Sequence, residues 1–518
     1  MRWLSTMKQE ELTARGCLRT FEYEKGSSTL SCRLVLCITL FHILPCPETK
    51  KGFAKMSHDG SHVDTQPPAH ADLPIFEGIF STEEGDRRLA SDDFGHLVHR
   101  VPSAVLSPRS VDDVVRVVQY ARQHGLTVAP RGQGHSTSGQ AQVEGGIVVH
   151  LTSLNAITAI HADCVEVEAG ALWSTLLQAT LAQGLTPPVL TDFTGLSIGG
   201  VLSVGGIGGT SYRYGPIVDN VLALEVVTGE GKLETCSPQQ QPDLFHNVLA
   251  GLGQCGMIVK ATLRLVPAPT HARVFHLFYP HVGAMLHDQR LLMRDGRFDY
   301  LLGYIIPTPQ GTWGYMLEGT IFYTSSAQHP DNAQLLAHLG FIAGIEQVED
   351  MTYLTFANRV VLQVDGLKAQ GAWDQQHPWF DVFVPDSKIE PFVSEALAEI
   401  SPIDFGLMPI LLYGLDSASF RAPLLPAPAE GTFFLFDILR SLAPSSGTLA
   451  QAIEHNRQLY ERSRALGATC YPIGTLNLTP ADWQAHFGPQ WVGLQRAKQR
   501  FDPDDILTPG QNIFPRQK

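Results

Sequence analysis

The stretch APRGQGHS, residues 129–136, decides how the rest of the chain is interpreted. Its glycines, Gly132 and Gly134, allow backbone conformations that other residues avoid and let a ligand approach the backbone closely. Consecutive N–H groups of such a loop can converge on an anion such as a pyrophosphate. His135 stands at the end of the loop. Because a short Gly-rich turn is more often only a turn, its interpretation depends on the sequence around it.

The residues on either side predict alternating strands and helices. Residues 101–107 predict a short strand, and residues 110–125 predict an amphipathic helix with Ser110 as its N-cap and Gly125 at its end. Residues 126–132 predict a strand that leads directly into the loop. The loop therefore follows the C-terminal end of a strand, where α/β folds commonly bind ligands.

Further strands and a second Gly-rich tract follow. Strands are expected at 145–155, 164–170 and on both sides of the turn at 228–231, with helices at 172–184 and after residue 243. Residues 190–209 (LTDFTGLSIGGVLSVGGIGG) alternate Gly with Leu, Ile and Val, whereas flexible linkers pair Gly with Ser. The tract favours a close backbone approach to a large flat ligand. Asp192 near its start is, taken alone, typical of a cap or turn.

Length and charge narrow the class of protein. A chain of 518 residues is too long for one ordinary core, which predicts two domains or a two-lobed enzyme. The hydrophobic share of 44% and the charged share of 17% indicate a globular protein. The net charge of −14 argues against a nucleic-acid partner and against a membrane-adsorbing surface.

The first seventy residues differ from the rest and are expected to be a separate N-terminal extension. The apolar run at residues 34–44 is shorter than the roughly 20 residues of a membrane span, so we expect no membrane span. Its length suits the core of a signal peptide, although a clear cleavage site is missing. Translation starting at Met56 is the rival explanation. We therefore expect a cytoplasmic protein, with secretion as the alternative, and a region 1–70 that is disordered or mis-started.

Several motifs, in order, resemble a known family. RGQGHS, TDFTGLSIGG, VVTGEG (226–231) and LAGLGQCGMI (249–258) resemble the PCMH-type FAD-binding domain of the vanillyl-alcohol oxidase superfamily. Within that superfamily, the second half is similar to the cytokinin dehydrogenases, over about residues 90 to 515 in all. The motifs that carry this similarity are EDMTYLTFANRV (349–360), HPWFDVFVP (377–385), ILLYGLDS (410–417), FFLFDILRS (433–441), DWQAHFG (482–488) and FDPDDILTPGQNIF (501–514).

The resemblance implies an α+β fold of three parts after the extension. An FAD-binding domain of two α/β subdomains would occupy residues 71–268, and an α+β domain that caps the substrate would occupy residues 269–465. Residues 466–518 would return to the FAD-binding domain.

The resemblance also implies the cofactor and its site. FAD would be attached covalently through its 8α carbon to His135, since a neutral imidazole is nucleophilic and a tether retains the flavin. The tract at 190–209 has no Cys, so a second covalent link is not expected. The pyrophosphate loop would consist of Gly132, Gln133, Gly134, Ser136 and Gln140. The flavin would be lined by Asp192, Ser197, Ile198, Ser203, Ile258, Tyr471, Thr508 and Gln511.

The family's reaction would be the oxidation of an N6-isoprenoid adenine to adenine and an aldehyde. Asp192 matches the active-site Asp and would take the substrate N–H proton, with a quinone-type acceptor or O2 reoxidising the flavin. Two departures concern the substrate: Leu302 stands where plant members commonly have an acidic residue, and Phe420 replaces a Trp. An oxidase of an alcohol, hydroxy acid or sugar, or a flavin-binding protein without turnover, therefore remains open.

Overall fold

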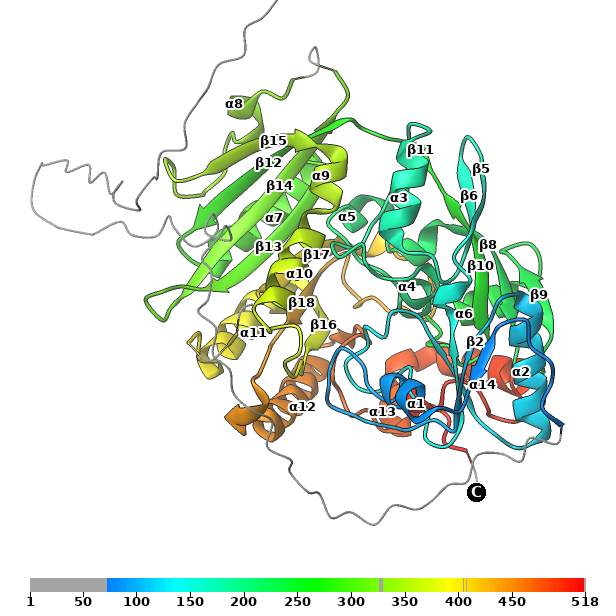
Figure 1. Ribbon diagram of the computed structural model, residues 1–518. Coiled ribbons are helices and arrows are strands. Elements are labelled where there is room, and N and C mark those ends of the chain that lie inside the picture. The colour runs from blue at the N-terminus through cyan, green and yellow to red at the C-terminus, as the bar shows by residue number, and fades with distance from the viewer. Residues whose placement is uncertain (1–71, 326–328, 404, 407, 517–518) are drawn as a thin grey trace, which may run out of the picture. The chain divides into compact units, whose positions relative to one another are not determined.

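The structure, a computed structural model, describes residues 72–325, 329–403, 405–406 and 408–516 (Figure 1). The expectations for the N-terminal extension, including the apolar run at 34–44, fall outside these residues. Within the described ranges, no helix combines the length and the apolar character needed to cross a membrane.

A four-stranded sheet carries the first Gly-rich loop. Strands β2, β4 and β3 are parallel, and β1 pairs antiparallel with β2. The loop follows β3, at the end of a parallel strand as predicted. Helix α2 begins after Ser110, whose side chain makes no capping hydrogen bond. The elements here are β1 (Ile79–Ser81), α1 (Glu84–Ala90), β2 (Ala104–Ser107), α2 (Val111–Gln123), β3 (Val128–Arg131) and β4 (Ile147–His150).

A second, antiparallel sheet has the strand order β5-β6-β10-β8-β9. The predicted hairpin around residues 228–231 is present as β8 and β9. The second Gly-rich tract contains helix α4, because Ile198, Val201 and Leu202 share a buried face. The elements are β5 (Ile157–Ile160), β6 (Cys164–Glu168), α3 (Trp173–Leu181), α4 (Ile198–Val204), α5 (Ser211–Tyr214), β8 (Val221–Val227), β9 (Leu233–Cys236), α6 (Pro242–Val248) and β10 (Met257–Arg264). The short strands β7 (Leu185–Thr186) and β11 (Val266–Pro267) pair with each other.

The remaining strands form one eight-stranded antiparallel sheet, in the order β15-β12-β14-β13-β17-β18-β16-β19. Helices α7, α11 and α12 pack beside it, as Figure 1 shows. The sheet extends past the expected boundary at residue 465, because β19 pairs with β16. The strands are β12 (His271–Tyr279), β13 (Tyr300–Pro307), β14 (Trp313–Tyr323), β15 (Gln347–Thr352), β16 (Phe380–Pro385), β17 (Ile410–Asp416), β18 (Thr432–Ile438) and β19 (Thr469–Cys470). The helices are α7 (Val282–Asp295), α8 (Asn332–Leu335), α9 (Tyr353–Ala357), α10 (Arg359–Ala369), α11 (Asp386–Glu399) and α12 (Leu449–Ala465). The mixed α+β class is confirmed.

The C-terminal segment returns to the first sheet after α13 (Pro480–Phe487) and α14 (Trp491–Phe501). The Val128 N–H donates to the Ile506 carbonyl at 2.8 Å, and the Thr508 N–H donates to the Val128 carbonyl at 2.9 Å. The red end of the chain in Figure 1 thus lies against the blue strands. Residues 506–508 extend the sheet beside β3, close to the Gly-rich loop.

Candidate functional site

The two Gly-rich tracts meet at a point where only glycine fits. A Cβ atom on Gly132 would lie 2.0 Å from Ser197 Oγ, and one on Gly134 would lie 2.2 Å from Arg131 Nη2. Gly134 also has a positive φ of 66°, which other residues rarely adopt. Arg131 Nη1 is buried without a hydrogen-bond partner among the described residues. A bare backbone cradle beside an unpaired guanidinium N–H fits an anionic group such as the pyrophosphate of FAD.

An N-terminal segment that the sequence did not point to holds this loop in place. The Phe94 N–H donates to the Gly134 carbonyl at 2.9 Å. Asp93 Oδ2 accepts hydrogen bonds from Ser136 Oγ at 2.9 Å and from the Gly139 N–H at 2.7 Å. Burial raises the pKa of Asp93 to about 6. The loop conformation therefore depends on residues about forty positions earlier.

His135 lies in an aromatic enclosure. Its ring stacks on Phe94 with centroids 4.2 Å apart, and Phe94 also stacks on His377 at 4.0 Å. Trp373 and Trp379 lie 5.5 Å and 5.7 Å from the His135 ring. Burial lowers the pKa of His135 to about 4. The imidazole is therefore neutral at physiological pH, the form in which a ring nitrogen is nucleophilic.

The C-terminal segment joins both tracts through residues named from the sequence. Gln140 Nε2 donates to the Gly474 carbonyl at 3.4 Å, and the Gly206 N–H donates to Tyr471 Oη at 3.2 Å. Thr508 Oγ1 donates to the Gly253 carbonyl at 3.0 Å. Among the other predicted residues, Ser203 Oγ donates a hydrogen bond to the Gly199 carbonyl, and the Gln511 carbonyl accepts one from Trp483 Nε1. Ile198 and Ile258 are buried, whereas Gln133 is exposed. Their contacts with a flavin stay predictions.

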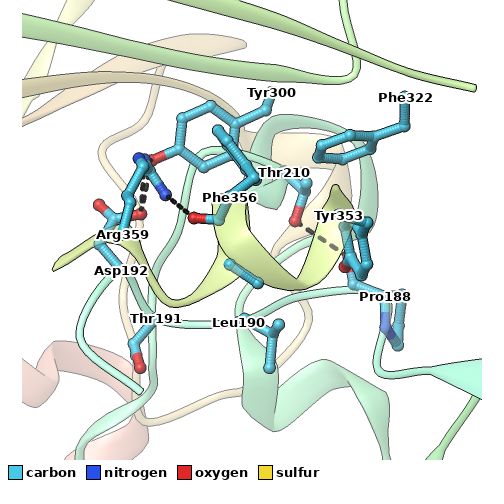
Figure 2. A pocket seen from close by; sticks show the side chains of 11 residues that line it. Pro188, Leu190, Thr191, Asp192, Thr210, Tyr300, Phe322, Tyr353, Phe356 and Arg359 are labelled. Atoms are coloured by element: carbon cyan, nitrogen blue, oxygen red, sulfur yellow. Dashed lines mark hydrogen bonds and ion pairs between the residues drawn. The ribbon is translucent and has the colours of Figure 1, made fainter. Parts of the chain in front are cut away.

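Asp192 lies where the second tract meets the large sheet. Its Oδ1 accepts a hydrogen bond from Tyr300 Oη at 2.5 Å, and its Oδ2 accepts one from Tyr413 Oη. Arg359 Nη2 lies 3.6 Å from Oδ1. Figure 2 shows Asp192, Tyr300 and Arg359 converging on one side of a small pocket. The carboxylate is thus oriented by residues of β13, β17 and α10.

Arg359 connects Asp192 to a second buried carboxylate. Its Nη2 donates to Tyr300 Oη at 2.7 Å and to Glu318 Oε1 at 2.8 Å. His276 Nε2 lies 3.4 Å from the other Glu318 oxygen. Burial acts to raise the pKa of Glu318, but the Arg359 guanidinium and His276 hold it below its usual value. The site therefore contains an ion-pair network rather than a lone carboxylate.

Tyr300, Tyr413, Glu318 and Arg359 are not among the site residues predicted from the sequence. For Glu318 and Arg359 the available signal is a single charge within an otherwise apolar strand or helix start, as in MLEGTIF and FANRV. Such charges are usually paired when buried. A buried charge in the sequence does not reveal which residue pairs with it, and here the partner lies on another element.

Of the three residues expected to contact the substrate, Asp192 lies in the pocket lining, whereas Leu302 and Phe420 lie outside it. Leu302 is fully buried on β13, in register with Glu318 of β14. Phe420 packs with its ring centroid 6.0 Å from Phe383 and 5.0 Å from Phe433. Their substrate contacts stay predictions. The pocket itself is lined by Pro188, Leu190, Thr191, Asp192, Thr210, Tyr300, Phe322, Tyr353, Phe356, Ala357 and Arg359.

Comparison with known proteins agrees with this geometry. Residues 102–237 match the family described as "FAD binding domain", and residues 305–514 match "Cytokinin dehydrogenase 1, FAD and cytokinin binding". Fold and site therefore define an FAD-dependent oxidoreductase.

Relatives define the family more narrowly. "Cytokinin dehydrogenase 4" of Oryza sativa subsp. japonica is 35% identical over 85% of this chain and 90% of its own length. "Cytokinin dehydrogenase 2" of Arabidopsis thaliana is 32% identical over 86% of this chain and 95% of its own length. "Uncharacterized oxidoreductase ORF5 in fasciation locus" of Rhodococcoides fascians is 38% identical over 84% and 99%. The protein belongs to the cytokinin dehydrogenase family.

Proposed function

We propose that this protein oxidises the C–N bond that joins the isoprenoid side chain to N6-isoprenoid adenines, giving adenine and an aldehyde. The observation that carries the proposal is the carboxylate of Asp192, held by two tyrosines where the FAD-binding tract meets the large sheet. Family membership supports the substrate class, since relatives are named cytokinin dehydrogenases.

Asp192 takes the proton from the substrate N–H. Each carboxylate oxygen has a second lone pair, so the hydrogen bonds from Tyr300 and Tyr413 leave capacity for this contact. Bound FAD supplies the acceptor for the hydride from the neighbouring carbon. The resulting imine hydrolyses to the amine and the aldehyde, and a quinone-type acceptor or O2 takes the electrons.

The cofactor is held covalently by His135 in this proposal. His135 would hold FAD through its 8α carbon, and the cradle at Gly132 and Gly134 would hold the pyrophosphate. The neutral imidazole and its aromatic enclosure support this assignment.

The test is anaerobic flavin reduction by a panel of isopentenyladenine, an alcohol, a hydroxy acid and a sugar. We expect bleaching by isopentenyladenine, with adenine and an aldehyde as products. Bleaching by another donor and never by isopentenyladenine would contradict the proposal.

The alternative is a covalent-FAD oxidase of an alcohol, hydroxy acid or sugar. It is favoured by Leu302, an aliphatic residue fully buried where plant members commonly have an acidic one. The same panel separates the two. A flavin that no donor reduces would instead indicate a binding protein without turnover.

A further inference from the structure

Two aspartates face each other across neighbouring strands of the large sheet. Asp381 of β16 and Asp437 of β18 are register partners in an antiparallel pair, so their side chains project from the same face. Like charges directly opposite one another destabilise a sheet. The proposed reaction does not use either residue.

Within the described part of the chain, no other residue donates a hydrogen bond to three of the four oxygens of these carboxyl groups. Asp381 is completely buried and Asp437 is 4% exposed. Both oxygens of Asp381 and Oδ1 of Asp437 are buried without a hydrogen-bond partner among the described residues. Burial and its neighbour's charge raise the pKa of Asp381 well above the ordinary range, and burial raises that of Asp437 to about 8. One proton shared between the carboxyl groups makes one hydrogen bond and leaves the other oxygens unsatisfied.

The pair lies on strands whose neighbouring residues contact His135 and Asp192. Trp379, two residues before Asp381 and directly ahead of β16, has its ring 5.7 Å from that of His135. On the other side, the register partner of Asp437 on β17 is Leu411, two residues before the Tyr413 that holds Asp192. Electrostatic interactions link Asp437 to Tyr413, Tyr471 and Asp192, so the pair adjoins the side of the site that holds Asp192.

The segment 471–475 packs against Asp381 and connects it to Thr137, which directly follows the Gly-rich loop at 129–136. The Tyr471 N–H donates to the Asp381 carbonyl at 3.0 Å, and a Cβ on Gly474 would lie 2.3 Å from Asp381 Oδ2. Thr137 Oγ1 donates to the Ile473 carbonyl at 2.9 Å. The titratable groups that act on the pair from the surrounding elements are Asp192, Tyr413, Cys470 and Tyr471. None of these is a cation.

We propose that Asp381 and Asp437 form a ligand-binding carboxyl pair that shares one proton and accepts hydrogen bonds from the N–H edge of a heteroaromatic ring. Two rings in the proposed reaction have such an edge, the purine of the substrate and the isoalloxazine of FAD. The purine assignment rests on the proposed function, whereas the isoalloxazine assignment requires only FAD binding.

The experiment compares the full-length FAD-loaded protein with Asp381→Leu, Asp437→Leu and the isosteric Asp381→Asn. The matched control is Asp416→Asn, an exposed aspartate on β17 of the same sheet. In one arm, adenine, 9-methyladenine and N6,N6-dimethyladenine are titrated and binding is followed by flavin absorbance. In the other arm, the absorbance spectrum and midpoint potential of the flavin are measured without ligand.

If the purine is the partner, wild type binds adenine about tenfold more tightly than at least one methylated form, and the Leu variants lose this preference. If the isoalloxazine is the partner, all three variants shift the ligand-free spectrum and potential. Asp416→Asn changes neither arm. Unchanged adenine affinities together with an unchanged flavin, in Asp381→Asn as well as in the Leu variants, overturn the proposal. If isopentenyladenine does not reduce the flavin of the wild type, the proposed substrate is wrong. The ligand-free flavin spectrum and potential of the variants then decide whether the carboxyl pair contacts the isoalloxazine.

Discussion

At the scale of single residues, the environment of His135 sets the state of its imidazole. The parallel stack on Phe94 and the pKa of about 4 come from residues distant in sequence. Physical enclosure, rather than the motif, keeps this imidazole neutral.

We expect the His135→Ala protein to retain no flavin after acid precipitation, because the imidazole proposed to hold the flavin covalently is absent. The denatured wild type should stay yellow and fluorescent, and its covalent fraction should be constant between about pH 6 and pH 9 because His135 is neutral throughout. Free release of flavin from wild type would contradict the covalent link.

Replacement of the proposed base should separate chemistry from cofactor binding. Asp192→Asn keeps the shape and one acceptor oxygen for a tyrosine O–H, and its NH2 group faces the other tyrosine oxygen, but the amide cannot take a proton. We expect normal FAD content and flavin reduction slower by ~10²- to 10⁴-fold in stopped-flow measurements. Tyr413→Phe removes one of the hydrogen bonds that orient Asp192, so we expect a smaller decrease in the rate of flavin reduction in this variant. An unchanged rate in Asp192→Asn would remove this residue from the mechanism.

At the scale of elements, the ion pair between α10 and β14 fixes the position of the helix on the large sheet. Arg359→Met leaves Glu318 buried with His276 as its remaining partner, and removing one member of a buried pair costs about 3–5 kcal/mol. Urea unfolding should show this loss. The double variant Arg359→Met/Glu318→Gln should recover part of it; equal losses in the two variants would show that the charge is not the cause.

The aspartate pair on β16 and β18 should make stability depend on pH. The pKa of Asp437 rises from 3.8 in the unfolded chain to about 8 in the fold. Between these values the unfolded chain releases a proton that the folded protein keeps, so the free energy of unfolding falls as pH rises. Asp437→Asn should flatten this dependence in urea unfolding between about pH 4 and pH 8, whereas Asp416→Asn should follow wild type. Parallel curves for wild type and Asp437→Asn would refute the prediction.

Local sequence patterns predicted the elements better than the site. Strands β3, β6 and β8 and helix α2 follow from periodicity and their Gly or Pro ends, because those signals act within a few residues. Helix α4 was hidden in a Gly-rich tract, since its helical character depends on burial of Ile198 and Leu202. Tyr300, Tyr413 and Arg359 meet Asp192 only through the register of the large sheet, which no local pattern encodes.

At the scale of the whole molecule, the C-terminal return adds a segment to the first sheet beside the Gly-rich loop. Asp502 accepts hydrogen bonds from the Ile506 and Leu507 N–H groups and from Lys498 Nζ, and both charged residues are buried. This arrangement shapes the turn that sends residues 506–508 alongside β3.

We expect Asp502→Ala to release this segment. Loss of the carboxylate removes the close partner of the buried Lys498, with a cost of about 3–5 kcal/mol, and should also lower the FAD content. Limited proteolysis should cleave the variant near its C-terminus under conditions that leave wild type intact. Asp504→Asn, which removes only an exposed ion pair with Arg122, serves as the control. Equal resistance of Asp502→Ala and wild type would show that other contacts hold the segment.

The stack of His135, Phe94 and His377 has a consequence for the order in which the protein matures. Its three rings come from segments that are far apart in the sequence, and none of them can orient the others until all have folded together. If the bond to His135 forms as proposed, it forms only on molecules that have completed this assembly. Covalently bound flavin would then be a permanent record of correct folding, and the colourless fraction of a preparation would measure the molecules that did not finish.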